Sequence, residues 1–187
     1  MNKKLVLILG ASSDIGLSIT KKFVEEGYQV LAHYNKGNKN FTKYIKNTTN
    51  VFAIKFNFIT TNNKIEKFLK NKKILKADIF INALGYIKPE NFKNINLENF
   101  EKTLKVNFYP SFILTKNLGL KMCKKKWGRI VHISSIGVKF GGGENNYYYS
   151  LSKHCLEFFP SYTKKWVQKN VLINTIRVGA TDTKLHK

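Results

Sequence analysis

The chain has 187 residues, of which 43% are hydrophobic and 13% aromatic, which is enough for one globular domain with a substantial core. Its formal net charge is +22, from 33 basic and 11 acidic residues, and such a charge taken alone indicates a polyanionic partner such as nucleic acid. Only Arg129 and Arg177 are arginines, however, whereas nucleic-acid readers use arginine forks for phosphates and guanines. We therefore expect no specific nucleic-acid partner, and only weak attraction to polyanions.

The remaining composition points to a reduced compartment without a resident metal. The two cysteines, Cys123 and Cys155, favour a cytoplasmic setting over a disulfide framework, and the cysteines and histidines lack metal-ligand spacing. Residues 1–9 imitate a signal peptide, but the apolar run is short and passes directly into a glycine-containing loop. No segment is long enough to span a membrane.

The first predicted strand covers Lys4 to Leu9, a continuous apolar run typical of a central parallel strand. The loop Gly10 to Gly16 follows and opens a helix whose apolar positions have helical spacing: Ile15, Ile19, Phe23 and Val24. A strand, a small-residue turn and a helix amino terminus together form a phosphate cradle, because backbone N–H groups and the helix dipole face an anion. The alternative interpretation is an ordinary turn between strand and helix.

A second strand is predicted over Tyr28 to His33, and it leads into Tyr34, Asn35 and Lys36. In dinucleotide-binding folds an acidic residue at this point bonds the ribose 2′-hydroxyl, whereas a basic residue accepts a 2′-phosphate. No carboxylate lies close and Lys36 does, so NADP is preferred over NAD. Phe41 to Ile45 is predicted as a short helix.

The third strand is predicted over Val51 to Phe56 and ends at Asn57, which is placed to touch the adenine. An amphipathic helix is expected over Thr61 to Lys72, with its lysines in solvent and its buried face formed by Ile65, Phe68 and Leu69.

The fourth strand, Asp78 to Ile81, ends in the small-residue turn Asn82-Ala83-Leu84-Gly85. Asn96 to Lys126 reads as mostly helical with an interruption near Pro110. Asn107 lies inside this stretch, and a polar amide in an apolar helix is either hydrogen-bonded structurally or functional.

The fifth strand is predicted over Trp127 to Ser135, with a glycine-rich flexible loop from Gly137 to Asn146 after it. A helix is predicted over Tyr147 to Lys169 and a sixth strand over Val171 to Val178. Strands that alternate with helices predict an α/β fold, a doubly wound parallel sheet with helices on both faces and right-handed crossovers. The whole chain, 1–187, is expected to be a single domain.

Tyr149 and Lys153 lie four residues apart, so a helix places the phenol and the ammonium on one face. An unperturbed tyrosine has a pKa of about 10, so proton transfer near neutrality needs a shift of about 3 units, or about 4 kcal/mol. A cation about 4 Å away supplies energy of that order at an effective dielectric of about 20. Ser135, at the carboxyl end of its strand, is a candidate partner. The alternative for the pair alone is a solvated lysine beside a half-buried tyrosine.

Taken together, these motifs resemble the short-chain dehydrogenase/reductase family in its classical branch, a Rossmann-like fold. The glycine loop matches Gly10 to Gly16, the Asn-Asn-Ala-Gly turn matches Asn82 to Gly85, and the catalytic tetrad falls on Asn107, Ser135, Tyr149 and Lys153. The agreement in order and spacing extends over essentially the whole chain.

The resemblance implies an NAD(P)-dependent oxidoreductase that interconverts a carbonyl and a secondary alcohol by hydride transfer. Tyr149 is then the acid or base, Lys153 lowers its pKa and holds the nicotinamide ribose, Ser135 orients the substrate oxygen, and Asn107 positions a water. The cofactor-binding residues implied, besides Tyr149 and Lys153, are Gly10, Ser12, Ser13, Ile15, Gly16, Tyr34, Asn35, Lys36, Asn57, Asn82, Ala83, Gly85, Gly179, Thr181 and Thr183.

Several positions depart from the family pattern. Asp14 replaces the middle glycine, where a carboxylate either caps the helix or repels pyrophosphate, and Val178 stands where proline is usual. The chain ends at Lys187, before the family's usual carboxyl-terminal strand and substrate lid, so it is expected to be either a fragment or a truncated member. A small-molecule carbonyl or alcohol substrate and possible homo-oligomers are implied.

Two other functions stay open at this stage. The first is a dinucleotide-binding module that has lost turnover, and the second is polyanion binding through the lysine-rich surface. The second predicts sequence-independent association that survives physiological salt.

Overall fold

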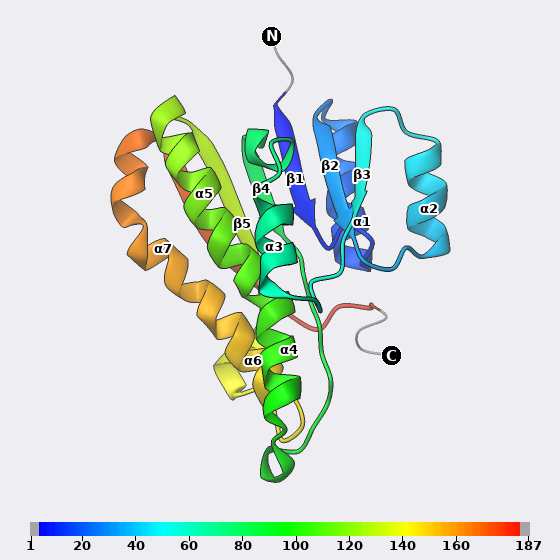
Figure 1. Cartoon of the computed structure of the whole chain (residues 1–187), viewed down its shortest axis with the longest axis vertical. Coiled ribbons are helices and arrows are strands. Elements are labelled where there is room, and N and C mark those ends of the chain that lie inside the picture. The colour runs from blue at the N-terminus through cyan, green and yellow to red at the C-terminus, as the bar shows by residue number, and fades with distance from the viewer. Residues whose placement is uncertain (1–3, 184–187) are drawn as a thin grey trace.

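Strand β1 (Leu5–Leu9) lies inside a six-stranded parallel sheet in the computed structural model, which describes residues 4–183 (Figure 1). The strand order is β3-β2-β1-β4-β5-β6. The other strands are β2 (Gln29–Tyr34), β3 (Val51–Lys55), β4 (Ile79–Asn82), β5 (Gly128–Ser135) and β6 (Val171–Val178). All six predicted strands are confirmed within one or two residues, together with their parallel pairing.

Apolar side chains on alternate positions of β1 supply two separate cores, because successive side chains of a strand point to opposite faces. Val6 and Ile8 belong to the core under α1 (Asp14–Glu25) and α2 (Lys39–Lys46). Leu7 and Leu9 belong to the core under α3 (Asn62–Leu69) and α5 (Tyr109–Lys125). Figure 1 shows α3 and α5 in front of the sheet. The doubly wound architecture expected from the sequence is confirmed.

The long helical stretch after β4 breaks at Phe108 into α4 (Leu97–Asn107) and α5. Pro110 lies in the first turn of α5, where its missing N–H costs nothing because that group has no partner inside the helix. The predicted interruption near Pro110 is therefore confirmed, and it leaves Asn107 as the last residue of α4.

The prediction of a single α-helix over 147–169 is wrong. It consists of α6 (Tyr147–His154), α7 (Phe159–Tyr162) and two 3₁₀ segments, η4 (Cys155–Phe158) and η5 (Lys164–Lys169). Pro160 has no N–H for the carbonyl of Leu156, and that carbonyl accepts from the Thr175 hydroxyl on β6 at 3.1 Å instead. The tighter turns therefore follow from a proline and from a side chain of the sheet.

Shorter 3₁₀ turns connect the main elements, and one of them corrects the loop prediction after β5. They are η1 (Ile74–Lys76), η2 (Phe92–Asn94) and η3 (Ile136–Phe140). Residues Gly137 to Phe140 thus form a 3₁₀ turn, whereas Gly141, Gly142 and Gly143 all have left-handed backbone.

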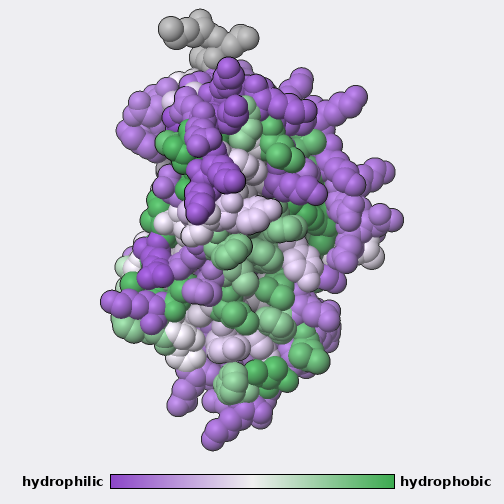
Figure 2. Space-filling view, turned by 90° about the vertical axis from the view of Figure 1, so that its left-hand side faces the viewer, coloured by the Kyte–Doolittle hydropathy of each residue, from purple (hydrophilic) through white to green (hydrophobic). Residues whose placement is uncertain are grey.

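The face formed by α5, η4 and α7 carries a group of exposed apolar side chains, which Figure 2 shows as a green area surrounded by hydrophilic residues. Phe112 and Leu120 are about half exposed, and Phe158 and Tyr162 are more exposed still. Phe108, Phe159 and Trp166 help to line a hollow of about 470 Å³ on this face.

Three further observations concern the described part of the chain. None of the helices between residues 4 and 183 is both long and apolar enough to cross a membrane. The same residues form no group of three or more His, Cys, Asp and Glu side chains suited to a metal ion. Cys123 and Cys155 are free thiols.

Candidate functional site

The candidate site lies at the carboxyl ends of β1 and β4, where the chain order reverses between neighbouring strands. In open parallel sheets this switch point leaves a crevice for ligands. From there, three adjoining cavities of about 300, 260 and 340 Å³ extend from the end of β2 to the ends of β5 and β6. The first two share Ser12, Ser13, Ala83, Leu84 and Gly85, and the last two share Ile15, Ile133, Tyr149 and Thr183.

The glycine loop packs directly against the turn after β4. Gly10 has φ +76°, and a Cβ atom there would lie 2.6 Å from the Ala83 carbonyl oxygen, so a side chain is excluded on two counts. The Ser13 hydroxyl oxygen accepts from the Gly16 N–H at 3.0 Å and caps α1. Asp14 is the first helical residue and lines the middle cavity, so Ser13 is the N-cap, and both interpretations of the Asp14 carboxylate stay open.

The His33 side chain at the end of β2 holds the glycine loop by a hydrogen bond that was not predicted from the sequence. Its Nδ1 accepts from the Gly10 N–H at 3.2 Å, and its Nε2 lies 3.0 Å from the Phe56 carbonyl oxygen. Because the first partner is a donor and the second an acceptor, the ring carries its proton on Nε2. Burial lowers the pKa of His33 to about 4, so the neutral ring persists at neutral pH.

We expect this buried histidine to make stability pH-dependent. Because the pKa of His33 is lower in the folded than in the unfolded chain, its contribution is complete above about pH 6.5 and is lost as the pH falls towards 4. The difference between 6.5 and about 4 corresponds to about 3 kcal/mol of unfolding free energy. Urea unfolding at a series of pH values should show a shallower decline for His33→Gln than for the wild type.

The control for this experiment is His154→Gln, because the His154 side chain is 66% exposed. It should follow the wild-type pH dependence. If His33→Gln also followed it, His33 would not be held neutral in the folded chain.

The first cavity is lined at the end of β2 by Asn35 and Lys36, and at the end of β3 by Asn57. These residues were predicted to contact the adenosine half of a dinucleotide, and the fold brings them together. Tyr34 is not among the residues that line this cavity; its ring packs 5.2 Å from that of Phe41.

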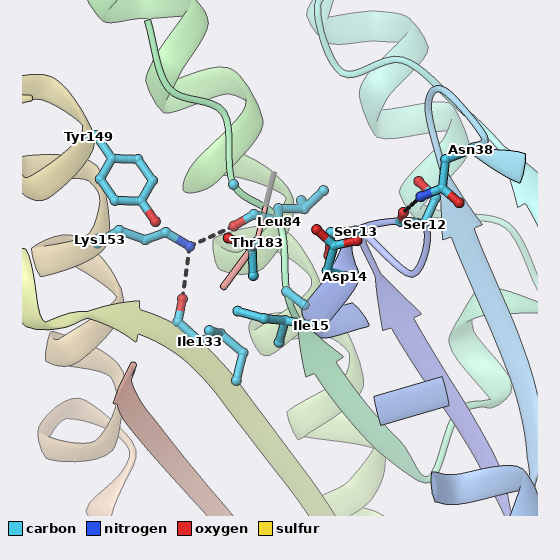
Figure 3. Close-up of a pocket in the computed structure, with 12 residues that line it drawn as sticks. Ser12, Ser13, Asp14, Ile15, Asn38, Leu84, Ile133, Tyr149, Lys153 and Thr183 are labelled. Carbon is cyan, nitrogen blue, oxygen red and sulfur yellow. Dashed lines mark hydrogen bonds between the residues drawn. The ribbon is translucent and has the colours of Figure 1, made fainter. Parts of the chain in front are cut away.

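A short loop clamps the glycine loop to this cavity. The Ser12 hydroxyl donates to the Lys36 carbonyl at 3.0 Å, and the Asn38 amide donates to the Ser12 carbonyl at 2.7 Å. Asn38 also caps α2 by accepting from the Phe41 N–H, and it lines the middle cavity (Figure 3). Asn38 is not among the residues predicted for the site, although an asparagine three residues before the first apolar helical position is a helix-start signal.

Lys153 lies on α6, and its side chain is held by two backbone carbonyls from other segments. Its Nζ donates to Leu84 at 2.6 Å and to Ile133 at 2.8 Å, drawn as dashed lines in Figure 3. The residue is 2% exposed, and burial lowers its pKa to about 7. These two bonds use two of the three N–H groups of an ammonium, and the side chain lines the middle cavity.

Tyr149 lies one turn before Lys153 and borders both the middle and the third cavity. The Lys153 Nζ is 5.6 Å from the centre of the tyrosine ring. Burial raises the pKa of Tyr149 in this arrangement. The expectation that Lys153 lowers the pKa of Tyr149 stays a prediction, because in this structure the Lys153 Nζ is directed to the carbonyls of Leu84 and Ile133.

The other two members of the predicted tetrad occupy different positions. Ser135 ends β5 and lines the third cavity with Tyr149, while its hydroxyl oxygen accepts from the Gly137 N–H at 3.1 Å. Asn107 is fully buried: it bonds both backbone groups of Tyr86, at 2.7 and 2.9 Å, and donates to the Ser152 hydroxyl at 2.9 Å. Asn107 thus ties the turn after β4 to α6, whereas the predicted water remains a prediction.

The segment after β6 closes the third cavity. Gly179, Thr181 and Thr183 all line it, and Thr183 also reaches the middle one. Asn82 is fully buried and lies outside the lining of all three cavities; its side-chain oxygen accepts from the Leu84 N–H at 3.3 Å. Gly16 packs so closely on Gly10 that a side chain would collide with the loop backbone. Residues 184–187 lie outside the described residues.

Comparison with known proteins identifies the family. The family model described as short chain dehydrogenase matches residues 4–187. The chain belongs to the short chain dehydrogenase family. It is 31% identical over 186 residues to the 3-oxoacyl-[acyl-carrier-protein] reductase FabG of Aquifex aeolicus, covering 96% of this chain and 75% of that protein. It is 25% identical to the acetoacetyl-CoA reductase of Cupriavidus necator, covering 97% and 77%.

Solved structures show the same fold for this short chain dehydrogenase. A short chain dehydrogenase/reductase family protein superimposes with a TM-score of 0.85 at 17% identity, covering 97% of this chain and 76% of that one. ElxO with NADP bound superimposes with a TM-score of 0.78 at 23% identity, covering 98% and 76%. The chain thus spans about three quarters of the length of these relatives.

Proposed function

We propose that this chain is an NADP-preferring oxidoreductase that interconverts a ketone and a secondary alcohol. The observation that carries the proposal is the row of three cavities, which runs from Lys36 and Asn57, past the amino terminus of α1, to Tyr149, Lys153 and Ser135. Such an elongated groove matches a dinucleotide. At its far end it meets the groups that acid–base chemistry on a carbonyl requires.

The residues present fit a nicotinamide dinucleotide. Ser12 and Ser13 line the groove at the start of α1, where helix N–H groups and the helix dipole attract pyrophosphate. Lys153 carries a further donor for the ribose hydroxyls, and Thr183 borders the same cavity. When bound, the dinucleotide supplies a hydride donor or acceptor. Relatives of the same fold, ElxO among them, have NADP or NADPH bound.

Tyr149 is the acid in reduction. The raised pKa keeps it as the phenol at neutral pH, which is the form that protonates the carbonyl oxygen as hydride arrives. Ser135 borders the same cavity and supplies a second hydrogen bond to that oxygen. Lys153 would hold the ribose hydroxyls of a bound dinucleotide and supply the proton that Tyr149 gives up.

Lys36 determines the preference for NADP. We expect Lys36→Glu to weaken NADPH binding about 10- to 100-fold and to leave NADH binding nearly unchanged, because a hydrogen bond to a charged group contributes about 1.5–3 kcal/mol. The two dissociation constants, measured by titration at fixed salt, check this. Lys121→Glu is the matched control, because it makes the same change of charge at an exposed position on α5. A parallel loss in both variants would assign the effect to net charge alone.

Turnover is tested by following NADPH oxidation with a panel of carbonyl compounds. The panel includes a 3-oxoacyl thioester and acetoacetyl-CoA, because these occur in the names of two relatives. Consumption of NADPH with formation of the alcohol is the expected result. Cofactor binding without oxidation across the panel would instead favour the non-catalytic module.

The setting we propose is cytoplasmic, with a small-molecule substrate. Both cysteines are free, as a reducing compartment requires. The apolar face over α5 and α7 is a candidate surface for a homo-oligomer.

A further inference from the structure

Glu157, in the 3₁₀ segment η4, lies between the ends of β5 and β6. One carboxylate oxygen accepts from the Ser134 hydroxyl at 2.8 Å and from the Arg177 Nε at 2.8 Å. The other accepts from the Arg177 Nη2 at 2.7 Å, and the His154 Nδ1 lies 3.9 Å from it. The Glu157 side chain is 15% exposed, so this two-point pairing is shielded from solvent on the carboxylate side.

Each partner of Glu157 adjoins a part of the candidate site. Ser134 precedes Ser135 on β5, and its hydroxyl lies 3.4 Å from the Lys153 carbonyl oxygen. Arg177 is followed by Val178, which lines the third cavity and leads into the segment with Thr181 and Thr183. One carboxylate therefore links the helical stretch after Lys153 to the two strand ends that border the reacting centre.

The end of β6 is tied to the helical stretch after Lys153 by side-chain hydrogen bonds. β6 is an edge strand that pairs with β5 on one side, up to the register Ser135 with Val178. From Gly179 to Asp182 the chain is exposed, and Thr183 returns to a buried position. Besides β5, the Thr175 hydroxyl on the Leu156 carbonyl and the Glu157–Arg177 pair hold β6 to η4. Loss of the pair would loosen the strand end that carries Thr181 and Thr183 to the cavities.

We propose that Glu157 is a positioning residue, which sets the segment 179–183 against Tyr149 and Ser135 by holding Arg177 and Ser134. The proposal rests on the oxidoreductase function proposed above. Glu157 does not line the three cavities, so it acts through its partners. Small displacements of positioning groups cost catalysis more than folding, since about 1 Å of misplacement can reduce a rate about 100-fold.

The kinetic test compares Glu157→Ala, Arg177→Ala and the double variant. We expect each single change to lower kcat at least about tenfold per folded molecule, and the double variant to be little worse than either, because both act on the same strand end. Glu157→Gln retains a hydrogen-bond acceptor, so its kcat should lie between those of Glu157→Ala and the wild type. The control, Glu66→Ala, removes an exposed ion pair with Lys70 on α3 and should leave kcat unchanged.

Hydrogen exchange separates this proposal from failure of the proposed function. In the free chain, amides of residues 175–183 should exchange faster in Glu157→Ala than in the wild type, whereas those of β1 and β4 stay unchanged. That result supports positioning even if the wild type reduces no compound tested. Unchanged exchange over 175–183 would overturn the proposal. A lower melting temperature with wild-type kcat per folded molecule would overturn it as well, because Glu157 would then be merely structural.

Discussion

Tyr149→Phe should abolish most turnover while the cofactor still binds. The phenol lines both the middle and the third cavity and can supply a proton to a carbonyl oxygen there, and general acid catalysis contributes about 10²- to 10⁴-fold. Phenylalanine keeps the ring in its half-buried position, so the fold and the groove should persist. We expect kcat to fall about 1,000-fold and the NADPH dissociation constant to change less than about threefold. Steady-state kinetics and a binding titration on the same preparation measure both.

The matched control is Tyr162→Phe, which removes a hydroxyl from the same helical stretch where the side chain is 74% exposed. It should retain wild-type kinetics. Equal turnover of Tyr149→Phe and the wild type would show that another group donates the proton, and the acid role of Tyr149 would have to be abandoned.

Lys153→Met should lose both cofactor affinity and turnover. The Nζ spans the Leu84 and Ile133 carbonyls and lines the middle cavity, so methionine removes the anchor and the donor for the ribose. We expect kcat/KM to fall about 100-fold or more, because preorganised electrostatic contacts of this kind contribute about 3 kcal/mol. The fold should survive with lower stability, because methionine occupies similar space but leaves the Leu84 and Ile133 carbonyls without the Nζ donor.

Lys70→Met is the comparison variant, because Lys70 is an exposed lysine paired with Glu66. Its NADPH affinity should match the wild type. If Lys153→Met bound NADPH as tightly as Lys70→Met and had the wild-type kcat, the role of Lys153 would be limited to holding the ends of β4 and β5 together.

The positions of the strands along the sequence could be predicted because the pattern that indicates each strand is local. Leu5 to Leu9 is apolar at every position, as a strand buried on both faces must be, and the same holds in weaker form for the other central strands. Small residues at strand ends marked the turns that build the crevice. The family motifs then placed Tyr149 and Lys153 on one helix, where the structure has them.

What the sequence did not predict depends on contacts between distant segments. The position of His33 under Gly10, and of Lys153 between two carbonyls, follows from how neighbouring strands end, which no local pattern records. The burial that raises the pKa of Tyr149 is likewise a property of the assembled site. The stretch after Asn146 is not a single α-helix because Pro160 has no N–H for the Leu156 carbonyl, which accepts from a threonine of the distant strand β6 instead.

The measurement that tests the account most directly is titration of the wild-type chain with NADPH and, separately, with NADH. Quenching of Trp127 and Trp166 fluorescence, or energy transfer to the nicotinamide, reports binding. Saturable binding of NADPH, tighter than that of NADH, is the predicted result, because the groove leads from Lys36 to Lys153. Absence of binding by either nucleotide at millimolar concentration would contradict the account, since every proposed catalytic role depends on a bound dinucleotide.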